Sequence, residues 1–365
     1  MKKQTKIFID CHVFDQALQG TTTYIKGMYL ELIKDKTKTF YFASHKYNLE
    51  EFFGTHENVN YINYKSKNKF YRLLIELPQI IKNNNIDYAH FQYVVPPIKN
   101  CKFIVTIHDV LFLDYPQYFP FFYKLKNKIL FRFSAKYSDV VLTVSQFSKN
   151  RINKHFQIED VLITPNAVDE LFFEHYDKLD AKEKAKEKFN IENYFLFISR
   201  WEPRKNHHSL LKVFVEANYY QNYNLVFVGD DAIENKEYEQ YYETLPEEIK
   251  AKIFKFQKVN PNDLLMILRG ATLSVYPSIA EGFGIPPLEA IAAEIPSICS
   301  NTTAMSDFDF MKDNLFNPLD IMDINDKIKK ALNDKDLTYK KQKLQEKYNW
   351  ENSAKVFKDI IFDKN

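Results

Sequence analysis

Glycine and cysteine are scarce in this chain. Only seven of the 365 residues are glycine, and no Gly-x-Gly-x-x-Gly segment follows any of the strands predicted below, which argues against a dinucleotide dehydrogenase. The three cysteines, Cys11, Cys101 and Cys299, lie far apart and form neither a metal-ligand spacing nor a disulfide framework. A reducing compartment, and therefore a cytoplasmic location, is the simplest interpretation.

Long apolar runs and an excess of one charge are also missing. No run of about 18 apolar residues is present, so no segment is expected to span a membrane. The charged residues 1–10 lack the apolar core of a signal peptide. The formal net charge is +2, which gives little support to nucleic acid as a partner. The length and the 45% hydrophobic content favour a globular protein of two domains.

Short apolar runs alternate with helical patterns along the whole chain, which predicts βαβ units and mainly parallel sheets. The first series of predicted strands is Ile7–Asp10, Phe40–Ala43, Tyr88–Phe91, Phe103–His108, Val140–Val144 and Val161–Thr164. The second series is Tyr194–Ser199, Leu225–Val228, Ile253–Phe256, Leu273–Tyr276 and Ser297–Cys299. Helices are expected at Thr22–Ile33, Phe70–Ile81 and Trp350–Ile361.

The two series indicate an α/β protein with two doubly wound parallel-sheet domains. The charged stretch Asp177–Lys188 is expected to be solvated and to lie near the junction, so the N-terminal domain is assigned to residues 1–170 and the C-terminal domain to residues 171–347. Ligands of such sheets bind beyond the carboxyl ends of the strands. The loops that follow the strands are therefore the places to look for a site.

The loop after the predicted strand Leu273–Tyr276 carries two carboxylates and two glycines. Gly282 and Gly284 allow the backbone to approach a ligand closely, and a Pro-Pro pair then marks the start of a helix. The backbone N–H groups and the dipole of that helix start suit a phosphate. Glu289, expected in the first helical turn, is either a carboxylate favoured by the dipole or a ligand for two ribose hydroxyls. Glu281 is either a solvated loop charge or a functional group.

A second loop, Ser199–Asn206, gathers three cations after an apolar strand. Arg200, Arg204 and Lys205 could neutralise a diphosphate, since arginine offers a planar fork and lysine a mobile point charge. A solvated basic turn is the alternative interpretation, and Arg204 in particular could point to solvent. In the N-terminal half, His108 and Asp109 end a predicted strand, where the imidazole could bind a sugar hydroxyl or simply be a satisfied polar group. Gly20 opens the helix after the first strand.

These segments together resemble the retaining glycosyltransferases of family 4. Glu281 and Glu289, with Gly-Phe-Gly and Pro-Leu-Glu-Ala between them, look like the family's Glu–seven residues–Glu motif. The segments Arg200–Asn206 and Ile107–Asp109 are also similar to family elements, and the likeness covers nearly the whole chain. One departure is Glu294, which stands where the family often has glycine, so the usual tight turn is not expected there.

The resemblance implies a GT-B architecture of two facing Rossmann-like domains, with the acceptor bound by the N-terminal domain and a nucleotide-sugar donor bound by the C-terminal domain. It also implies that the helix of residues 348–365 packs back on the N-terminal domain. Arg200 and Lys205 would clamp the donor diphosphate, while His108 and Glu281 would contact the transferred sugar, with Asp109 beside them. The remaining implied donor contacts are Gly282, Phe283, Gly284, Glu289 and Val259, and Gly20 would lie in a loop near phosphate and acceptor.

The implied activity is transfer of a hexose with retention, with GDP-mannose as the leading donor and a glycan or lipid-linked acceptor of surface polysaccharide or lipopolysaccharide assembly. Mannosyl- and rhamnosyltransferases are the most similar members. Alternatives are a UDP- or dTDP-sugar transferase, an epimerase or phosphorylase of the same fold, and a non-catalytic sugar- or lipid-binding module. No cofactor is expected, and metal is expected to be unnecessary because Asp307-Phe-Asp309 lies beyond the glutamate helix.

The segment Phe119–Lys136 mixes aromatic residues with five cations. A basic amphipathic helix of this kind can lie on an anionic membrane surface. An ordinary surface helix whose lysines extend their charged ends to water is the alternative. The sequence therefore leaves open a peripheral position on the inner face of the plasma membrane.

Overall fold

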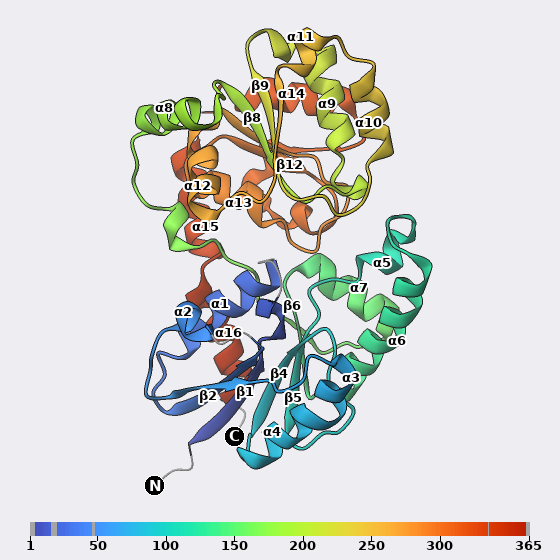
Figure 1. Cartoon of the computed structure of the whole chain (residues 1–365), viewed down its shortest axis with the longest axis vertical. Coiled ribbons are helices and arrows are strands. Elements are labelled where there is room, and N and C mark those ends of the chain that lie inside the picture. The colour runs from blue at the N-terminus through green and yellow to red at the C-terminus, as the bar shows by residue number, and fades with distance from the viewer. Residues whose placement is uncertain (1–3, 16–19, 46–47, 335, 363–365) are drawn as a thin grey trace. The chain divides into compact units, whose positions relative to one another are not determined.

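The computed structural model describes residues 4–15, 20–45, 48–334 and 336–362. The chain divides into two compact units (Figure 1). Unit 1 contains residues 1–167 together with the C-terminal residues 348–365, and unit 2 contains residues 168–347. In the described part of the chain, no helix combines the length and the apolar character that crossing a membrane requires.

The described part of unit 1 is built on a seven-stranded parallel sheet in the order β3-β2-β1-β4-β5-β6-β7. Alternate side chains of the central strands enter opposite faces, as the two-residue period of a strand requires. Phe8, Ala89 and Phe91 join the core on one face, while Phe42 and His90 meet Tyr29 on the other. The strands are β1 (Thr5–Asp10), β2 (Lys38–Ser44), β3 (Val59–Asn63), β4 (Tyr88–Gln92), β5 (Lys102–Thr106), β6 (Val140–Thr143) and β7 (Val161–Ile163).

Helices cover both faces of this sheet. Residues of α4, α6 and α7 join the hydrophobic cluster on the face of Phe8, whereas α1 packs with the C-terminal helix α16, whose Phe357 meets Tyr29 and His90. The helical elements are η1 (His12–Asp15), α1 (Gly20–Leu32), α2 (Leu49–Phe53), α3 (Lys69–Tyr71), the π-helix η2 (Arg72–Glu76), α4 (Leu77–Asn83), α5 (Leu111–Asp114), η3 (Pro116–Tyr118), α6 (Phe121–Tyr137), α7 (Gln146–Phe156) and α16 (Trp350–Phe362).

Unit 2 repeats this plan, its described residues forming a six-stranded parallel sheet in the order β10-β9-β8-β11-β12-β13. Its strands are β8 (Tyr194–Ile198), β9 (Asn224–Val228), β10 (Ile253–Phe256), β11 (Leu273–Tyr276), β12 (Ser297–Ser300) and β13 (Leu315–Phe316). The α-helices are α8 (Lys178–Phe189), α9 (His207–Glu216), α10 (Lys236–Glu243), α11 (Glu247–Lys250), α12 (Pro261–Gly270), α13 (Ile285–Ala292), α14 (Ile321–Ala331) and α15 (Leu337–Lys347). The 3₁₀ turns are η4 (Glu170–Phe172), η5 (Pro203–Lys205), η6 (Tyr219–Gln221), η7 (Thr303–Asp307) and η8 (Asp309–Asn314).

Two doubly wound units confirm the predicted α/β fold class, and local details differ from expectation. The stretch expected to be solvated, Asp177–Lys188, forms α8, which buries Ala181 and Ala185 and packs against α12. The single helix expected at Phe70–Ile81 is three successive segments, α3, η2 and α4. The edge strands β3 and β13 were not predicted. Glu294 adopts a left-handed conformation with φ 55°. The tight turn that was not expected at this position is therefore formed.

Candidate functional site

Two neighbouring strands of unit 2 bring the predicted cationic and acidic loops together. β8 and β11 are paired in parallel, with Phe195 opposite Leu273, so the loops that follow them leave the same edge of the sheet. The first loop passes through η5, and the second leads into α13. Backbone contacts lock the loops to each other, since Ile279 donates its N–H to the carbonyl of Arg204 over 2.8 Å.

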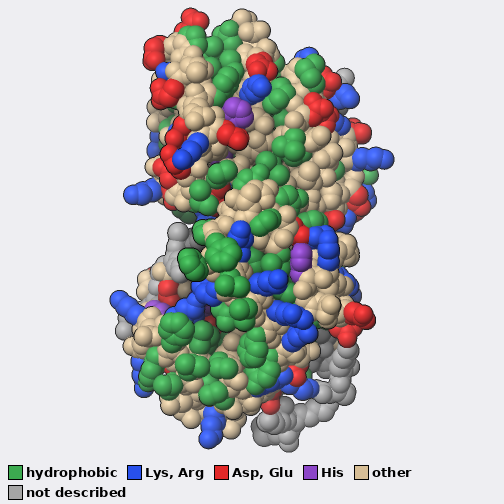
Figure 2. Space-filling view, turned by 90° about the vertical axis from the view of Figure 1, so that its right-hand side faces the viewer, with side chains coloured by type: hydrophobic (Ala, Val, Ile, Leu, Met, Phe, Trp, Pro, Cys, Tyr) green, Lys and Arg blue, Asp and Glu red, His purple; other side chains and the backbone are tan. Residues whose placement is uncertain are grey.

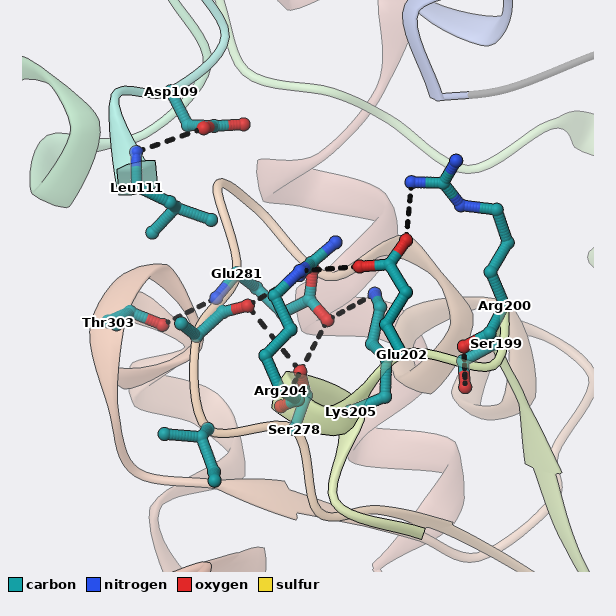
Figure 3. Close-up of polar contacts among 12 residues, drawn as sticks. Asp109, Leu111, Ser199, Arg200, Glu202, Arg204, Lys205, Ser278, Glu281 and Thr303 are labelled. Atoms are coloured by element: carbon teal, nitrogen blue, oxygen red, sulfur yellow. Dashed lines mark hydrogen bonds and ion pairs between the residues drawn. The ribbon is translucent and has the colours of Figure 1, made fainter. Parts of the chain in front are cut away.

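Glu281 is the centre of this arrangement (Figure 3). Its Oε1 accepts hydrogen bonds from Lys205 Nζ at 2.5 Å, Ser278 Oγ at 2.6 Å and Tyr276 OH at 3.2 Å. Its own backbone N–H donates to Thr303 Oγ1 over 2.9 Å. The solvated loop charge considered from the sequence is therefore wrong, because Glu281 is 8% exposed and its carboxylate is held by three side chains on one oxygen.

Charge pairing outweighs burial at this carboxylate. Burial by itself would raise the pKa of Glu281, but the charges of Lys205 and Arg204 lower that pKa to about 2. The buried ammonium of Lys205 has a lowered pKa because burial exceeds the opposing effect of Glu281. The carboxylate and the ammonium thus depend on each other, since either charge alone would be costly in this buried position.

A second carboxylate, Glu202, links the two arginines of the first loop. Glu202 Oε1 lies 2.6 Å from Arg200 NH2, and its Oε2 lies 2.7 Å from Arg204 Nε. Arg204 also donates to the carbonyl of Ala280 at 2.7 Å and lies 3.4 Å from Glu281 Oε2. The side chain of Arg204 is 12% exposed, so it points inward, contrary to the solvent-facing alternative. Arg200 is 52% exposed, so much of its guanidinium side chain is in contact with solvent.

The helix start at α13 differs in two respects from the sequence expectation. Gly284 precedes the helix with φ 100°, and a Cβ there would lie 2.8 Å from Met305 Cγ, so this position requires glycine. Two of the first four helical residues, Pro286 and Pro287, have no N–H, which leaves fewer donors for a phosphate than expected. Glu289 is the fifth residue of α13 and not in the first turn as expected, because the helix begins at Ile285.

Glu289 is a carboxyl group whose charged form is disfavoured. It is partly buried, and its carboxyl oxygens have no hydrogen-bond partner among the described residues. Burial, with a smaller contribution from the charge of Asp169, raises the pKa of Glu289 to about 7. A ligand hydroxyl that donated to this carboxylate would offset the loss of hydration.

The remaining predicted donor contacts in unit 2 lie in its loops. Phe283 is 6% exposed and packs edge-on against Phe308, while Gly282 precedes it in the loop. Val259 follows β10, where its side chain packs against the hydrophobic core of the unit. Only the backbone of Val259 is therefore free to take the role expected of it.

In unit 1, His108 lies two residues beyond the end of β5 and is 6% exposed. Burial lowers the pKa of His108 to about 3, so the imidazole is neutral at neutral pH. Its Nε2 lies 2.7 Å from Gln92 Oε1, and Gln92 Nε2 lies 3.3 Å from His90 Nε2. Because an amide oxygen can only accept, Nε2 of His108 carries the proton and Nδ1 the lone pair. Gln92 comes from the adjacent strand β4, and no motif in the sequence pointed to it.

Asp109 and Gly20 occupy the ends of helices in unit 1. Asp109 Oδ1 accepts a hydrogen bond from the N–H of Leu111 over 3.1 Å at the start of α5, so it shapes the chain after the strand. The imidazole Nε2 of His108 donates to Gln92 Oε1. Gly20 is the first residue of α1, which follows residues 16–19, outside the described part.

Asp309 of the Asp307-Phe-Asp309 segment forms an exposed ion pair. Its Oδ1 lies 2.9 Å from Lys347 Nζ, and the hydrogen bond from Lys347 lowers the pKa of Asp309. Within the described ranges, no group of three or more His, Cys, Asp or Glu side chains is arranged to hold a metal ion.

Two family models match the chain, one in each half. Residues 18–170 match the family model described as Glycosyltransferase Family 4, and residues 180–351 match Glycosyl transferases group 1. The chain is 33% identical to the O-antigen chain mannosyltransferase RfbU of Salmonella typhimurium over 209 residues, which are 57% of this chain and 54% of that protein. It is 26% identical to the serotype-specific mannosyltransferase WbdA of Escherichia coli over 240 residues, 60% of this chain and 28% of that protein.

The alignments thus span about half or less of the length of these relatives. Among solved structures, the sucrose-phosphate synthase of Thermosynechococcus elongatus superposes with a TM-score of 0.75 at 16% identity, covering 98% of both chains. This likeness concerns the fold. With both halves matched by glycosyltransferase models and both units built on the expected parallel sheets, the chain belongs to the glycosyltransferases of the family 4 and group 1 type and has the GT-B fold.

Proposed function

We propose that this protein is a retaining glycosyltransferase that moves a hexose from a nucleotide sugar to a glycan or lipid-linked acceptor in surface polysaccharide assembly. GDP-mannose is the proposed donor. The relatives, named as an O-antigen chain mannosyltransferase and a serotype-specific mannosyltransferase, support mannose as the sugar and surface polysaccharide assembly as the process. The observation that carries the proposal is the cluster of Arg200, Glu202, Arg204, Lys205 and Glu281 at one edge of the unit 2 sheet.

In this proposal the cluster binds the donor diphosphate. Arg200 is the exposed cation of the group, and its only ion pair in the described chain is with Glu202. Negative charge develops on the nucleoside diphosphate as it leaves, and preorganised cations stabilise that charge at the moment it forms. Lys205, held in its charged form by Glu281, adds a second positive centre. Glu289, whose carboxyl group has no hydrogen-bond partner among the described residues, accepts hydrogen bonds from the ribose hydroxyls.

The sugar itself is proposed to meet Glu281 and His108. The carboxylate of Glu281 is ionised at neutral pH and can favour positive charge on the anomeric carbon. Neutral His108 presents its Nδ1 lone pair, which can accept from a sugar hydroxyl. The acceptor attacks the face that the diphosphate leaves, and the leaving phosphate takes the acceptor proton, so the proposed reaction uses no metal and no cofactor. The free cysteines favour a cytoplasmic location.

Donor choice is tested by thermal unfolding with GDP, UDP, dTDP and their sugar conjugates, since a ligand that binds the folded protein raises its melting temperature. We expect GDP and GDP-mannose to give the largest increase, and Arg200→Ala to remove most of it. The matched control is Lys329→Ala on the exposed side of α14, which should leave the increase intact. An increase with UDP compounds alone would replace the proposed donor, and no increase with any nucleotide would refute the site.

Stereochemistry is tested without knowing the acceptor. Slow hydrolysis of GDP-mannose by the enzyme releases mannose, and proton NMR identifies the first anomer formed before mutarotation. Because the donor is α-linked, retention gives α-mannose first. Initial β-mannose would contradict the retaining mechanism while leaving the glycosyl transfer itself in place.

A further inference from the structure

A large apolar surface of unit 1 is left uncovered on two helical segments. Phe70, Tyr71, Leu74 and Ile75 come from α3 and η2, and Phe121, Phe122, Tyr123, Leu125, Ile129 and Phe133 come from α6. These ten are most of the seventeen large hydrophobic side chains that are exposed in the described part of the chain. Phe122 is 82% exposed, Phe70 72% and Ile129 62%. We call this surface the basic apolar face.

The two segments rest on one core and present one face. Leu73 of η2 and Phe131 of α6 both belong to the hydrophobic cluster on the same side of the unit 1 sheet. The π-helical turn of η2 buries Arg72 and Glu76 while leaving Leu74 and Ile75 at 47% and 41% exposure. Figure 2 looks onto unit 1 from the side of α3 and α6 and shows green hydrophobic and blue cationic side chains intermingled there, with few red ones.

The charges of this face have one sign. Residues 64–75 contain three exposed lysines besides the buried Arg72, residues 119–138 contain five lysines or arginines, and neither stretch contains Asp or Glu. Within the described chain, none of these eight cations other than Arg72 forms an ion pair. Burial and then the nearby charges of Lys126 and Arg72 lower the pKa of Lys69, so cations of the two segments repel each other. A surface so arranged is stabilised by an anionic partner.

We propose that the basic apolar face docks on the surface of an anionic phospholipid bilayer, with its aromatic and aliphatic side chains among the lipid head groups and its cations at the phosphates. The mixture of exposed aromatic, leucine and isoleucine side chains with unpaired cations is the pattern of an interfacial helix. Nucleic acid would use the cations and stack on the aromatic rings, but it offers nothing to Leu125 or Ile129. The proposal holds for the surface whether or not the protein transfers mannose.

The test is co-sedimentation of the full chain with vesicles of phosphatidylcholine alone or with about one third phosphatidylglycerol, at low and high salt. We expect binding to the anionic vesicles that weakens with salt, because each cation near such a surface contributes roughly a fivefold gain in partitioning. The triple variant Lys126→Glu, Lys128→Glu, Arg132→Glu should lower the partition coefficient at least a hundredfold. Its matched control, Lys182→Glu, Lys329→Glu, Lys330→Glu on exposed positions of unit 2, should bind like the wild type.

The apolar contribution is tested separately. Phe121→Ser with Phe122→Ser removes two exposed rings and should lower binding more than tenfold, whereas Leu179→Ser with Leu319→Ser, 72% and 70% exposed on unit 2, should not. Circular dichroism melts establish that each variant is folded. Three results would overturn the proposal. The first is equal binding to neutral and anionic vesicles, and the second is an equal loss of binding in both triple variants. The third is a dimer that disappears with Phe121→Ser and Phe122→Ser while no vesicle is bound. Binding of a soluble DNA duplex in place of vesicles would overturn it as well.

Discussion

At the scale of single residues, the two glutamates of unit 2 have opposite electrostatic situations. Glu281 is surrounded by donors and cations, which lower its pKa to about 2, whereas Glu289 has no hydrogen-bond partner in the described chain and its pKa is raised to about 7. The two glutamates lie eight positions apart. At neutral pH, Glu281 is therefore ionised and Glu289 is about half-protonated. Environment decides this difference, so the residue type alone could not predict it.

Glu289→Gln should stabilise the protein at high pH. The folded-state pKa of Glu289 lies above its ordinary value of 4.5, so between about pH 4.5 and 7 the folded protein keeps a proton that the unfolded chain has released, and stability falls as pH rises through this window. Glutamine avoids that loss. We expect Glu289→Gln to be more stable than the wild type by about 1–3 kcal/mol at pH 8 and equal to it near pH 4, as measured by thermal unfolding.

Glu281→Gln is the control of opposite sign. The folded-state pKa of Glu281 is depressed, so its contribution to stability is present above the ordinary pKa and is lost as pH falls toward 2. The substitution should destabilise the protein at pH 8, because Lys205 then remains buried without its counter-charge. A Glu289→Gln variant with the same stability as the wild type at every pH would contradict the raised pKa.

Glu294→Gly should also be stabilising. Glu294 holds φ 55° at the end of α13, which costs a non-glycine residue roughly 1 kcal/mol. Its ion pairs with Lys341 at 2.8 Å and Lys178 at 3.9 Å are exposed and contribute less than about 1 kcal/mol. Glu294→Ala loses the same ion pairs without relieving the backbone. Urea unfolding should therefore rank glycine at or above the wild type and alanine below it, and the reverse order would refute the argument.

At the scale of elements, helix α16 fits against α1 through a glycine. A Cβ on Gly27 would lie 2.0 Å from Trp350 Cε2, so no larger residue fits while the indole stays in place. Trp350 also meets Tyr24 edge-on, and Ser353 Oγ donates to the carbonyl of Pro165 over 2.7 Å. The C-terminal helix is thus built into unit 1 at several points.

Gly27→Ala should destabilise the protein although alanine is the better helix former. The higher helix propensity of alanine stabilises by about 1 kcal/mol, whereas overpacking against the indole costs typically 1–3 kcal/mol. In the Trp350→Leu background the clash is reduced, so Gly27→Ala should become neutral or stabilising there. Urea unfolding of the four proteins measures this coupling, and additive effects would show that the two residues do not compete for space.

The alternation of strands and helices was predictable because buried parallel strands are short apolar runs and the helices between them have a different period. The cationic and acidic loops could be placed at strand ends for the same reason. The hydrogen bond from His108 to Gln92 was not predictable, because it depends on the register of β4 against β5, in which Gln92 faces Thr106. The contacts of Ser278 and Tyr276 with Glu281 likewise depend on loop geometry, and β13 is only two residues long.

At the scale of the whole molecule, the two units differ in how the chain builds them. Unit 2 is one continuous segment, residues 168–347, whereas unit 1 joins residues 1–167 to 348–365. The continuous unit should fold alone. Residues 1–167 alone should be unstable, because the missing helix leaves Tyr29 and His90 without Phe357.

Expression of the fragments checks this expectation. Residues 168–347 should give dispersed amide NMR signals and a cooperative melt, whereas residues 1–167 should not. Joining residues 348–365 to residue 167 through a flexible linker should restore cooperative unfolding to unit 1. Cooperative unfolding of residues 1–167 without the helix would show that α16 is dispensable.

The position of Phe357 in the core of unit 1 has a consequence for the order of events on the ribosome. Domains usually fold in the order in which they are synthesised. Here residues 348–365, which are translated after all of unit 2, belong to the unit that begins with residues 1–167. The N-terminal sheet therefore cannot close its core around Phe357 until unit 2 has been synthesised. In this chain the unit that is started first is completed only after the other has been translated.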